Sequence, residues 1–117
     1  MKMYVAVLDE FPDHMTPTLV AHAVLGAHLE FSERHKDENG YKAGEPYYPL
    51  YINWLETSFK KVVVRVSQTE FDRIAALPDV YLGHESNTLE GRASCAVVCP
   101  RLETPRVLKF ACLWKPL

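Results

Sequence analysis

Residues 60–77, KKVVVRVSQTEFDRIAAL, restrict the fold more than any other segment of the chain. After two lysines, residues 62–66 form a valine-rich run of the kind found in strands that are buried on both faces. Ser67 and Glu70 then have the spacing of a capping box, which predicts a helix from there to about Leu77. Pro78 ends that helix. A buried strand followed directly by a capped helix is typical of an α/β domain.

The rest of the chain supplies further elements of the same kind. Thr16 and Pro17 have the pattern of an N-cap and a first helical residue, and apolar residues at 19, 20, 23, 24, 27 and 31 follow a 3.6-residue period. They predict a helix to about Ser32, with a short helix after Pro49. The expected strands are 2–8, 60–66, 79–83, 93–99 and 107–114, and the expected loops are 33–46 and 84–92. We expect one domain over residues 1–117, with a mixed sheet of about four strands flanked by helices.

Composition narrows the class of protein. The chain is 48% hydrophobic and 24% charged, which fits a globular domain, and no apolar run reaches the ~18–20 residues that span a membrane. No secretory signal is evident, and three cysteines, an odd number, favour a reducing compartment. We expect a cytoplasmic protein. The cysteine spacing fits no zinc site, so we expect buried thiols, no metal and no cofactor.

The charge is unevenly distributed along the chain. Residues 1–59 contain four Lys/Arg and nine Asp/Glu, whereas residues 60–117 contain nine Lys/Arg and six Asp/Glu. A nucleic-acid binder usually carries a basic stripe, and here only the second half could provide one. The charge therefore argues mildly against tight RNA binding.

Three segments, in this order and spacing, resemble the type II peptidyl-tRNA hydrolase superfamily, closest to the peptidyl-tRNA hydrolase domain-containing branch. They are LVAHAVLGA of the first helix, FKKVVVRVSQTEFDRIAAL, and GRASCAVVCP with the later LKFACLWK. The resemblance covers most of the chain outside the 33–50 insert. It implies that fold and, as an expected activity, hydrolysis of the ester of peptidyl-tRNA.

The catalytic pattern of the family is altered in this chain. Its Gly-Lys pair and its glutamine would align with positions that hold Met15 and Leu19. The surviving matches are His22, Lys61 and Thr88, and His84 or Glu85 aligns with the late aspartate. The fold therefore carries over better than the catalytic set.

The candidate site lies where ligands gather in α/β sheets, at the carboxyl ends of strands. Water would be activated there by Asp9, His84 or Glu85. Lys61 and the helix start at Thr16 would steady the oxyanion and the tRNA end, and Thr88, Lys60 and Arg92 complete the expected substrate contacts.

Each candidate also has a structural interpretation. His22 is either a proton shuttle or a hydrogen-bonded core histidine. Lys61 is either an anion ligand or a solvated strand end, and Asp9 with Glu10 is either a general base or an exposed acidic pair. Tyr41, Tyr47, Tyr48, Tyr51 and Trp54 could stack bases, but packing or an interface is the favoured role.

Two functions follow from these alternatives. The first is a peptidyl-tRNA ester hydrolase with tRNA as its partner. The second is an inactive relative that binds a protein, a small ligand or RNA, which the missing lysine and glutamine and the negative charge favour. Either function is compatible with a homodimer or with a protein partner. We expect no association with a membrane. An oligomeric structural or host-interaction protein is a third class.

Overall fold

The computed structural model describes residues 1–34, 36–37, 40–41, 48–84 and 91–117. Its main sheet has five strands in the order β5-β6-β1-β4-β7, not the four that were expected. The strands are β1 (Lys2–Leu8), β4 (Lys60–Val66), β5 (Val80–His84), β6 (Ala93–Val98) and β7 (Cys112–Leu113). A separate two-stranded sheet joins β2 (Lys36–Asp37) to β3 (Gly40–Tyr41). The expected α/β class is confirmed.

Strand direction determines which residues share an edge of the main sheet. β4 is parallel to β1, while β6 is antiparallel to both β1 and β5, so β1, β4 and β5 all run the same way. The three strands therefore end on the same side of the sheet, at Leu8, Val66 and His84. We call this side, formed by the strand ends, the carboxyl edge. β6 begins there, at Ala93. The opposite, amino edge holds Lys2, Lys60 and Val80.

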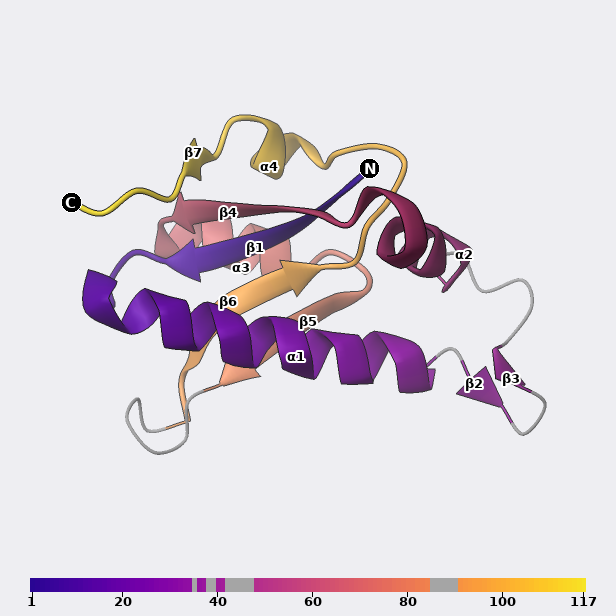
Figure 1. The fold of residues 1–117 in the computed structure, drawn as a ribbon. Helices are drawn as coiled ribbons and strands as arrows, with labels where there is room; N and C mark the ends of the chain where they lie inside the picture. The colour runs from indigo at the N-terminus through magenta and orange to yellow at the C-terminus, as the bar shows by residue number, and fades with distance from the viewer. Residues whose placement is uncertain (35, 38–39, 42–47, 85–90) are drawn as a thin grey trace.

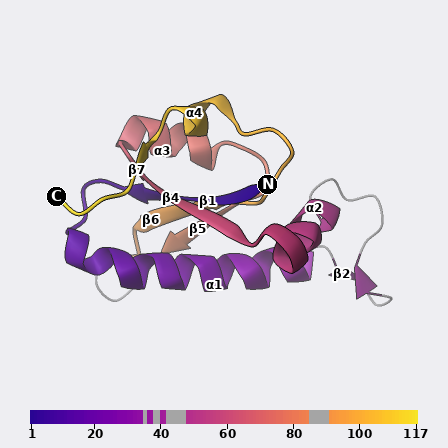
Figure 2. The same cartoon turned by 45° about the horizontal axis from the view of Figure 1, so that its top comes forward.

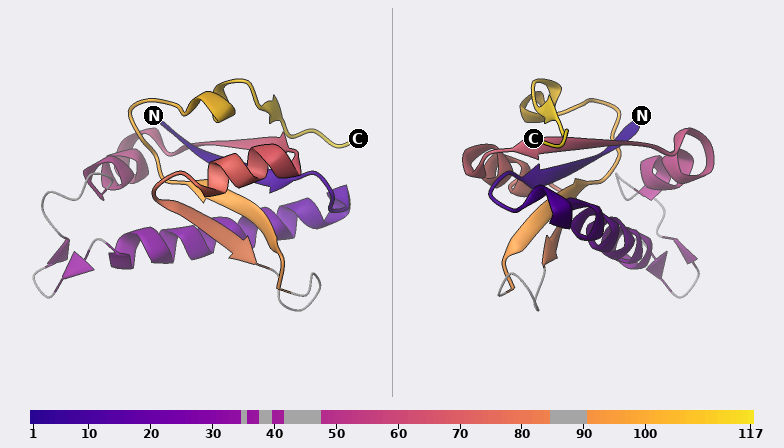
Figure 3. Two further views of the ribbon diagram at one scale, coloured as in Figure 1. Left: turned by 180° about the vertical axis from the view of Figure 1, so that it is seen from behind. Right: turned by 60° about the vertical axis from the view of Figure 1, so that its left-hand side comes forward.

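The helices cover both faces of this sheet, as the edge-on view of Figure 2 makes clear. α1 (Thr16–Arg34) lies along one face, and α3 (Gln68–Ala75) and α4 (Arg106–Lys109) lie on the other (Figures 1 and 3). α2 (Tyr48–Asn53) continues into a π-helical turn, Trp54–Ser58, beside the later part of α1. In the described ranges, no helix is long and apolar enough to cross a membrane.

The predicted apolar stripe of α1 packs against the sheet. Leu19, Ala23, Ala27 and Phe31 are buried along it. The helix begins earlier than predicted: a 3-10 turn, Asp13–Met15, runs directly into it, so Thr16 already has helical dihedral angles and is not an extended N-cap. The backbone N–H of Met15 donates to the carbonyl of Pro12, which places the start of the turn there.

The capping box predicted for α3 is confirmed. The backbone N–H of Glu70 donates to Ser67 Oγ at 3.3 Å, and the N–H of Ser67 donates to Glu70 Oε1 at 3.0 Å. Both bonds satisfy amide groups that the first helical turn leaves without intrahelical partners. Phe71 and Ile74 face the sheet from this helix.

The prediction of a single strand over residues 107–114 is wrong. Residues 106–109 form α4 after Pro105, and only Cys112–Leu113 pair with β4. Pro105 has the fixed φ that favours a helix start, and the run VLKFACLW fits a buried helix turn as well as a strand. Leu108 is the buried residue of α4.

Candidate functional site

The carboxyl edge brings together part of the predicted site. Asp9 and Glu10 follow β1, and the backbone N–H of Asp9 donates to the carbonyl of Val66 at 2.9 Å. Glu10 forms an ion pair with Arg92, which precedes β6. The guanidinium of Arg92 also lies 5.2 Å from the centre of the Phe11 ring. Arg92 is thus neutralised by a carboxylate of its own chain.

His84 ends β5 at this same edge and is exposed. Its Nδ1 lies 2.8 Å from the carbonyl oxygen of Gly91. A carbonyl only accepts hydrogen bonds, so Nδ1 carries the proton, and in the neutral ring Nε2 keeps a lone pair. That tautomer suits a general base. β6 separates His84 from Asp9, because β1 and β5 are two strand spacings, about 10 Å, apart.

Thr16 and His22 lie on α1. Thr16 is buried, with 4% of its surface exposed. His22 is exposed, between the buried residues Leu19 and Ala23, so the interpretation of His22 as a core histidine is wrong. The His22 side chain lies on the solvent side of the helix, where it makes a polar or ring contact with another group.

Lys60 and Lys61 lie at the amino edge. Lys61 is the cross-strand partner of Met3, and β1 continues for five residues beyond Met3 to Leu8. At about 3.3 Å per residue, Lys61 is about 16 Å from the carboxyl edge. The structure does not bring it together with Asp9 or His84. Lys60, the preceding residue of β4, is exposed, and strand alternation assigns it to the other face of the sheet.

Glu85 and Thr88, the remaining predicted site residues, lie outside the described residues, as does part of the 33–50 insert.

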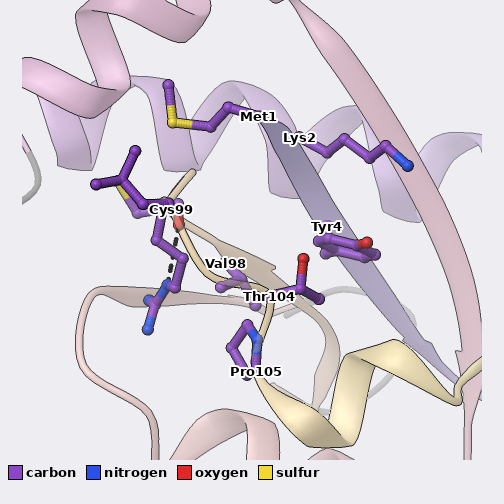
Figure 4. A pocket seen from close by; sticks show the side chains of 9 residues that line it. Met1, Lys2, Tyr4, Val98, Cys99, Thr104 and Pro105 are labelled. Atoms are coloured by element: carbon purple, nitrogen blue, oxygen red, sulfur yellow. Dashed lines mark hydrogen bonds between the residues drawn. The ribbon is translucent and has the colours of Figure 1, made fainter.

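Three further arginines in the second half of the chain, Arg65, Arg101 and Arg106, have separate positions. Arg65 pairs with Asp13 at 3.1 Å and donates to the carbonyl of Lys115 at 2.6 Å. Arg101 donates to the carbonyls of Cys99 and Pro78, and it lines a cavity of about 150 Å³ with Lys2, Tyr4 and Thr104 (Figure 4). Arg106 is on α4. The cations therefore lie on both faces and at both edges of the sheet.

The cysteines largely match the expectation of buried thiols. Cys95 and Cys99 are buried, whereas Cys112 on β7 is exposed. Desolvation raises the pKa of the Cys95 thiol to about 11, against a smaller lowering by a hydrogen bond with Ser94. Within the ranges that the structure describes, no three His, Cys, Asp or Glu side chains are placed to hold a metal ion.

The sequence did not predict a groove at the amino edge, between α1 and the π-helical turn. This groove has a volume of about 370 Å³. We call it the apolar groove, and it is lined by Met3, Ala21, Val24, Leu25, His28, Tyr51, Trp54, Leu55, Phe59 and Lys61. The aromatic residues between positions 51 and 59 and the lysine at position 61 can be recognised in the sequence. Only the fold shows that they lie next to α1.

Hydrogen bonds fix the floor of the apolar groove. His28 Nδ1 lies 2.6 Å from the hydroxyl of the buried Tyr51, and Trp54 Nε1 donates to the carbonyl of Lys60 at 2.7 Å. Tyr51 packs between Phe31 and Trp54, with ring centres 5.4 and 5.7 Å away. Tyr51 and Trp54 thus serve packing, the favoured alternative, and both also line the groove. The side chains of Tyr41, Tyr47 and Tyr48 lie outside the described part of the structure.

The sequence matches no protein-family model and no curated protein.

Proposed function

We propose that the chain is a non-catalytic binding module on a scaffold like that of the type II peptidyl-tRNA hydrolases. Its ligand site would be the apolar groove. The observation that carries this proposal is the placement of the cations: Lys61 and Arg92 lie at opposite ends of the strands, and Lys61, Arg65 and Arg92 each contact a group of their own chain.

RNA affinity depends on several cations that contact successive phosphates, and each such contact also makes binding salt-dependent. Arg92 and Arg65 are each paired with a carboxylate, which lowers the positive potential they can offer. Lys61 and Arg65 share one face of β4, whereas Arg106 lies on α4 on the opposite face, so one RNA helix cannot contact all three at once. The distribution therefore supports a partner other than tRNA.

The expected catalytic groups are also separated. The family lysine before the first helix corresponds to Met15, and Lys61 cannot replace it because it lies at the amino edge. An oxyanion needs a donor within about 3 Å of the reacting atom. A general base at the carboxyl edge and a cation about 16 Å away do not meet that requirement.

The test is binding of fluorescent tRNA, followed by anisotropy at 50 and 150 mM salt. We expect dissociation constants no tighter than about 10⁻⁴ M at the higher salt, the weak end of the ~10⁻⁴–10⁻⁶ M range typical of non-specific nucleic-acid binding. Micromolar binding that is weakened by both Lys61→Gln and Arg92→Gln would overturn the proposal, because two distant cations would then share one RNA.

One observation favours the hydrolase as a second candidate. The hydrogen bond from His84 Nδ1 to Gly91 leaves Nε2 as an exposed base next to an acidic edge. If His84 is catalytic, His84→Gln removes turnover of N-acetylated aminoacyl-tRNA, while His22→Gln on the surface of α1 does not. Unchanged background hydrolysis in all three proteins would exclude this candidate.

A further inference from the structure

We infer that the apolar groove binds an amphipathic carboxylate, a molecule with an apolar chain or ring and one carboxylate head. The inference rests on the proposed function and specifies the ligand of that same site. The volume of the groove, about 370 Å³, is within the ~300–1,000 Å³ usual for small-molecule sites.

The walls of the groove determine the body of the ligand. The groove is lined by Val24 and Leu25 of α1, by Trp54 and Leu55 of the π-helical turn with Phe59 after it, and by Met3 of β1. At the rim, Leu25 and Phe59 remain 64% and 53% exposed. Covering such side chains with an apolar ligand removes them from water at about 25 cal/mol per Å².

Among the described residues that line the groove, Lys61 is the one Lys or Arg, and it determines the head of the ligand. Lys61 Nζ donates to the carbonyl of Phe59 at 2.7 Å and lies 3.3 Å from the centre of the Phe59 ring. An ammonium group has three N–H donors, so this one bond leaves two for a ligand. The described residues that line the groove include no Asp or Glu. A carboxylate with an apolar body matches this charge and this wall.

The position of Lys61 is fixed by the backbone. Phe59 has φ 53° and ψ 14°, a left-handed conformation that is uncommon for an aromatic residue, and its N–H donates to the carbonyl of Trp54 at 2.7 Å. This cap turns the chain from the π-helical turn into β4. The Phe59 carbonyl and ring both contact Lys61, so the chain itself fixes the position of the ammonium beside the groove.

The experiment uses protein labelled with ¹⁵N at its two tryptophans, which give two indole signals. Trp54 lines the groove, while Trp114 lies near β7, with Arg65 5.3 Å from its ring. Decanoate is the probe, and decanol is the uncharged probe with the same chain. We expect decanoate to shift the Trp54 signal with saturation and to leave the Trp114 signal in place.

Two matched pairs of variants test the two halves of the site. Lys61→Met should weaken decanoate binding about two- to five-fold and leave decanol binding unchanged, while the neighbouring Lys60→Met should change neither. Leu25→Gln should weaken both ligands, while Leu29→Gln, also exposed on α1, should weaken neither.

Three results would overturn the inference. Equal loss of decanoate and decanol affinity in Lys61→Met would remove the role of the charge. Equal shifts of both indole signals would indicate non-specific binding. A dimer in the absence of ligand that Leu25→Gln dissociates would assign the groove to a second copy of the chain. None of these results implies tRNA binding or turnover, so failure here is distinguishable from failure of the proposed function.

Discussion

The ammonium group of Lys61 sits 3.3 Å from the centre of the Phe59 ring and donates to the carbonyl oxygen of that same residue. The two residues flank the start of β4, where the chain leaves the π-helical turn. This arrangement places a cation beside an apolar surface, and it does so at the edge of the sheet opposite the acidic residues.

Phe59→Asn tests this relationship. Asn tolerates the left-handed backbone better than Phe does, and this gain partly offsets the loss of the half-exposed ring. We therefore expect the free energy of unfolding to change by less than about 1 kcal/mol. Decanoate affinity should fall about five-fold, because one apolar wall is lost. Phe110→Asn, at another exposed phenylalanine on the far face, should leave affinity unchanged. A similar loss in both variants would contradict the role of Phe59.

Gly83→Ala tests the close contact of α1 with β5. A Cβ built on Gly83 would lie 2.8 Å from the Cβ of Ala23, a separation that normal packing does not allow. We expect urea denaturation to show a loss of about 1–3 kcal/mol.

Ala23→Gly provides the control for that substitution, since it removes the atom that would clash. The double variant should therefore be more stable than the sum of the two single effects predicts, by at least about 0.5 kcal/mol. Simple additivity would mean that the two residues do not meet in the folded protein.

Much of the fold could be predicted from local pattern. β1, β4 and α3 follow directly from valine-rich runs and from the Ser67–Glu70 capping box, because these signals depend on neighbouring residues alone. Residues 107–114 could not be assigned in the same way. A short apolar run fits either a strand or a buried helical turn. Only two residues of this run pair with β4.

The site was harder to predict because it depends on strand direction. Asp9 ends β1 and Lys61 begins β4, and in parallel neighbours these positions lie at opposite edges. Arg92 lies beside the end of β1, where it pairs with Glu10, and His84 lies at the same edge with β6 between them. The apolar groove was missed because its residues come from β1, α1 and the π-helical turn, and no local spacing connects them.

Asp13→Asn tests the ion pair with Arg65. Hydrogen bonds from the Arg65 guanidinium and from the backbone N–H of Leu117 lower the pKa of Asp13 in the folded protein. The carboxylate therefore stabilises the fold above its unfolded pKa, about 3.9, and this contribution is lost as pH falls through the lower folded value. We expect the variant to be less stable at pH 7 and to lose less stability on acidification.

Urea midpoints at pH 7 and pH 3 provide the measurement. Arg65→Gln should also reduce the pH dependence, because it removes the partner that lowers the pKa of Asp13 most. Identical pH dependence in the parent protein and Asp13→Asn would contradict the ion pair.

Thiol reactivity tests the burial of the cysteines. A pKa of about 11 leaves about 0.1% of Cys95 as thiolate at pH 8, and both Cys95 and Cys99 are buried. A disulfide reagent should therefore modify one thiol rapidly in the native protein, and Cys112→Ser should abolish that reaction. Rapid reaction of a second thiol would show that the β6 region opens to solvent.

The most direct test of the account is one NMR titration of the two indole signals, first with decanoate and then with tRNA at 150 mM salt. We predict that decanoate shifts the Trp54 signal alone and that tRNA neither shifts nor broadens either signal. Broadening of both signals by tRNA, with no response to decanoate, would show that the protein binds RNA and that the apolar groove has no ligand of this class.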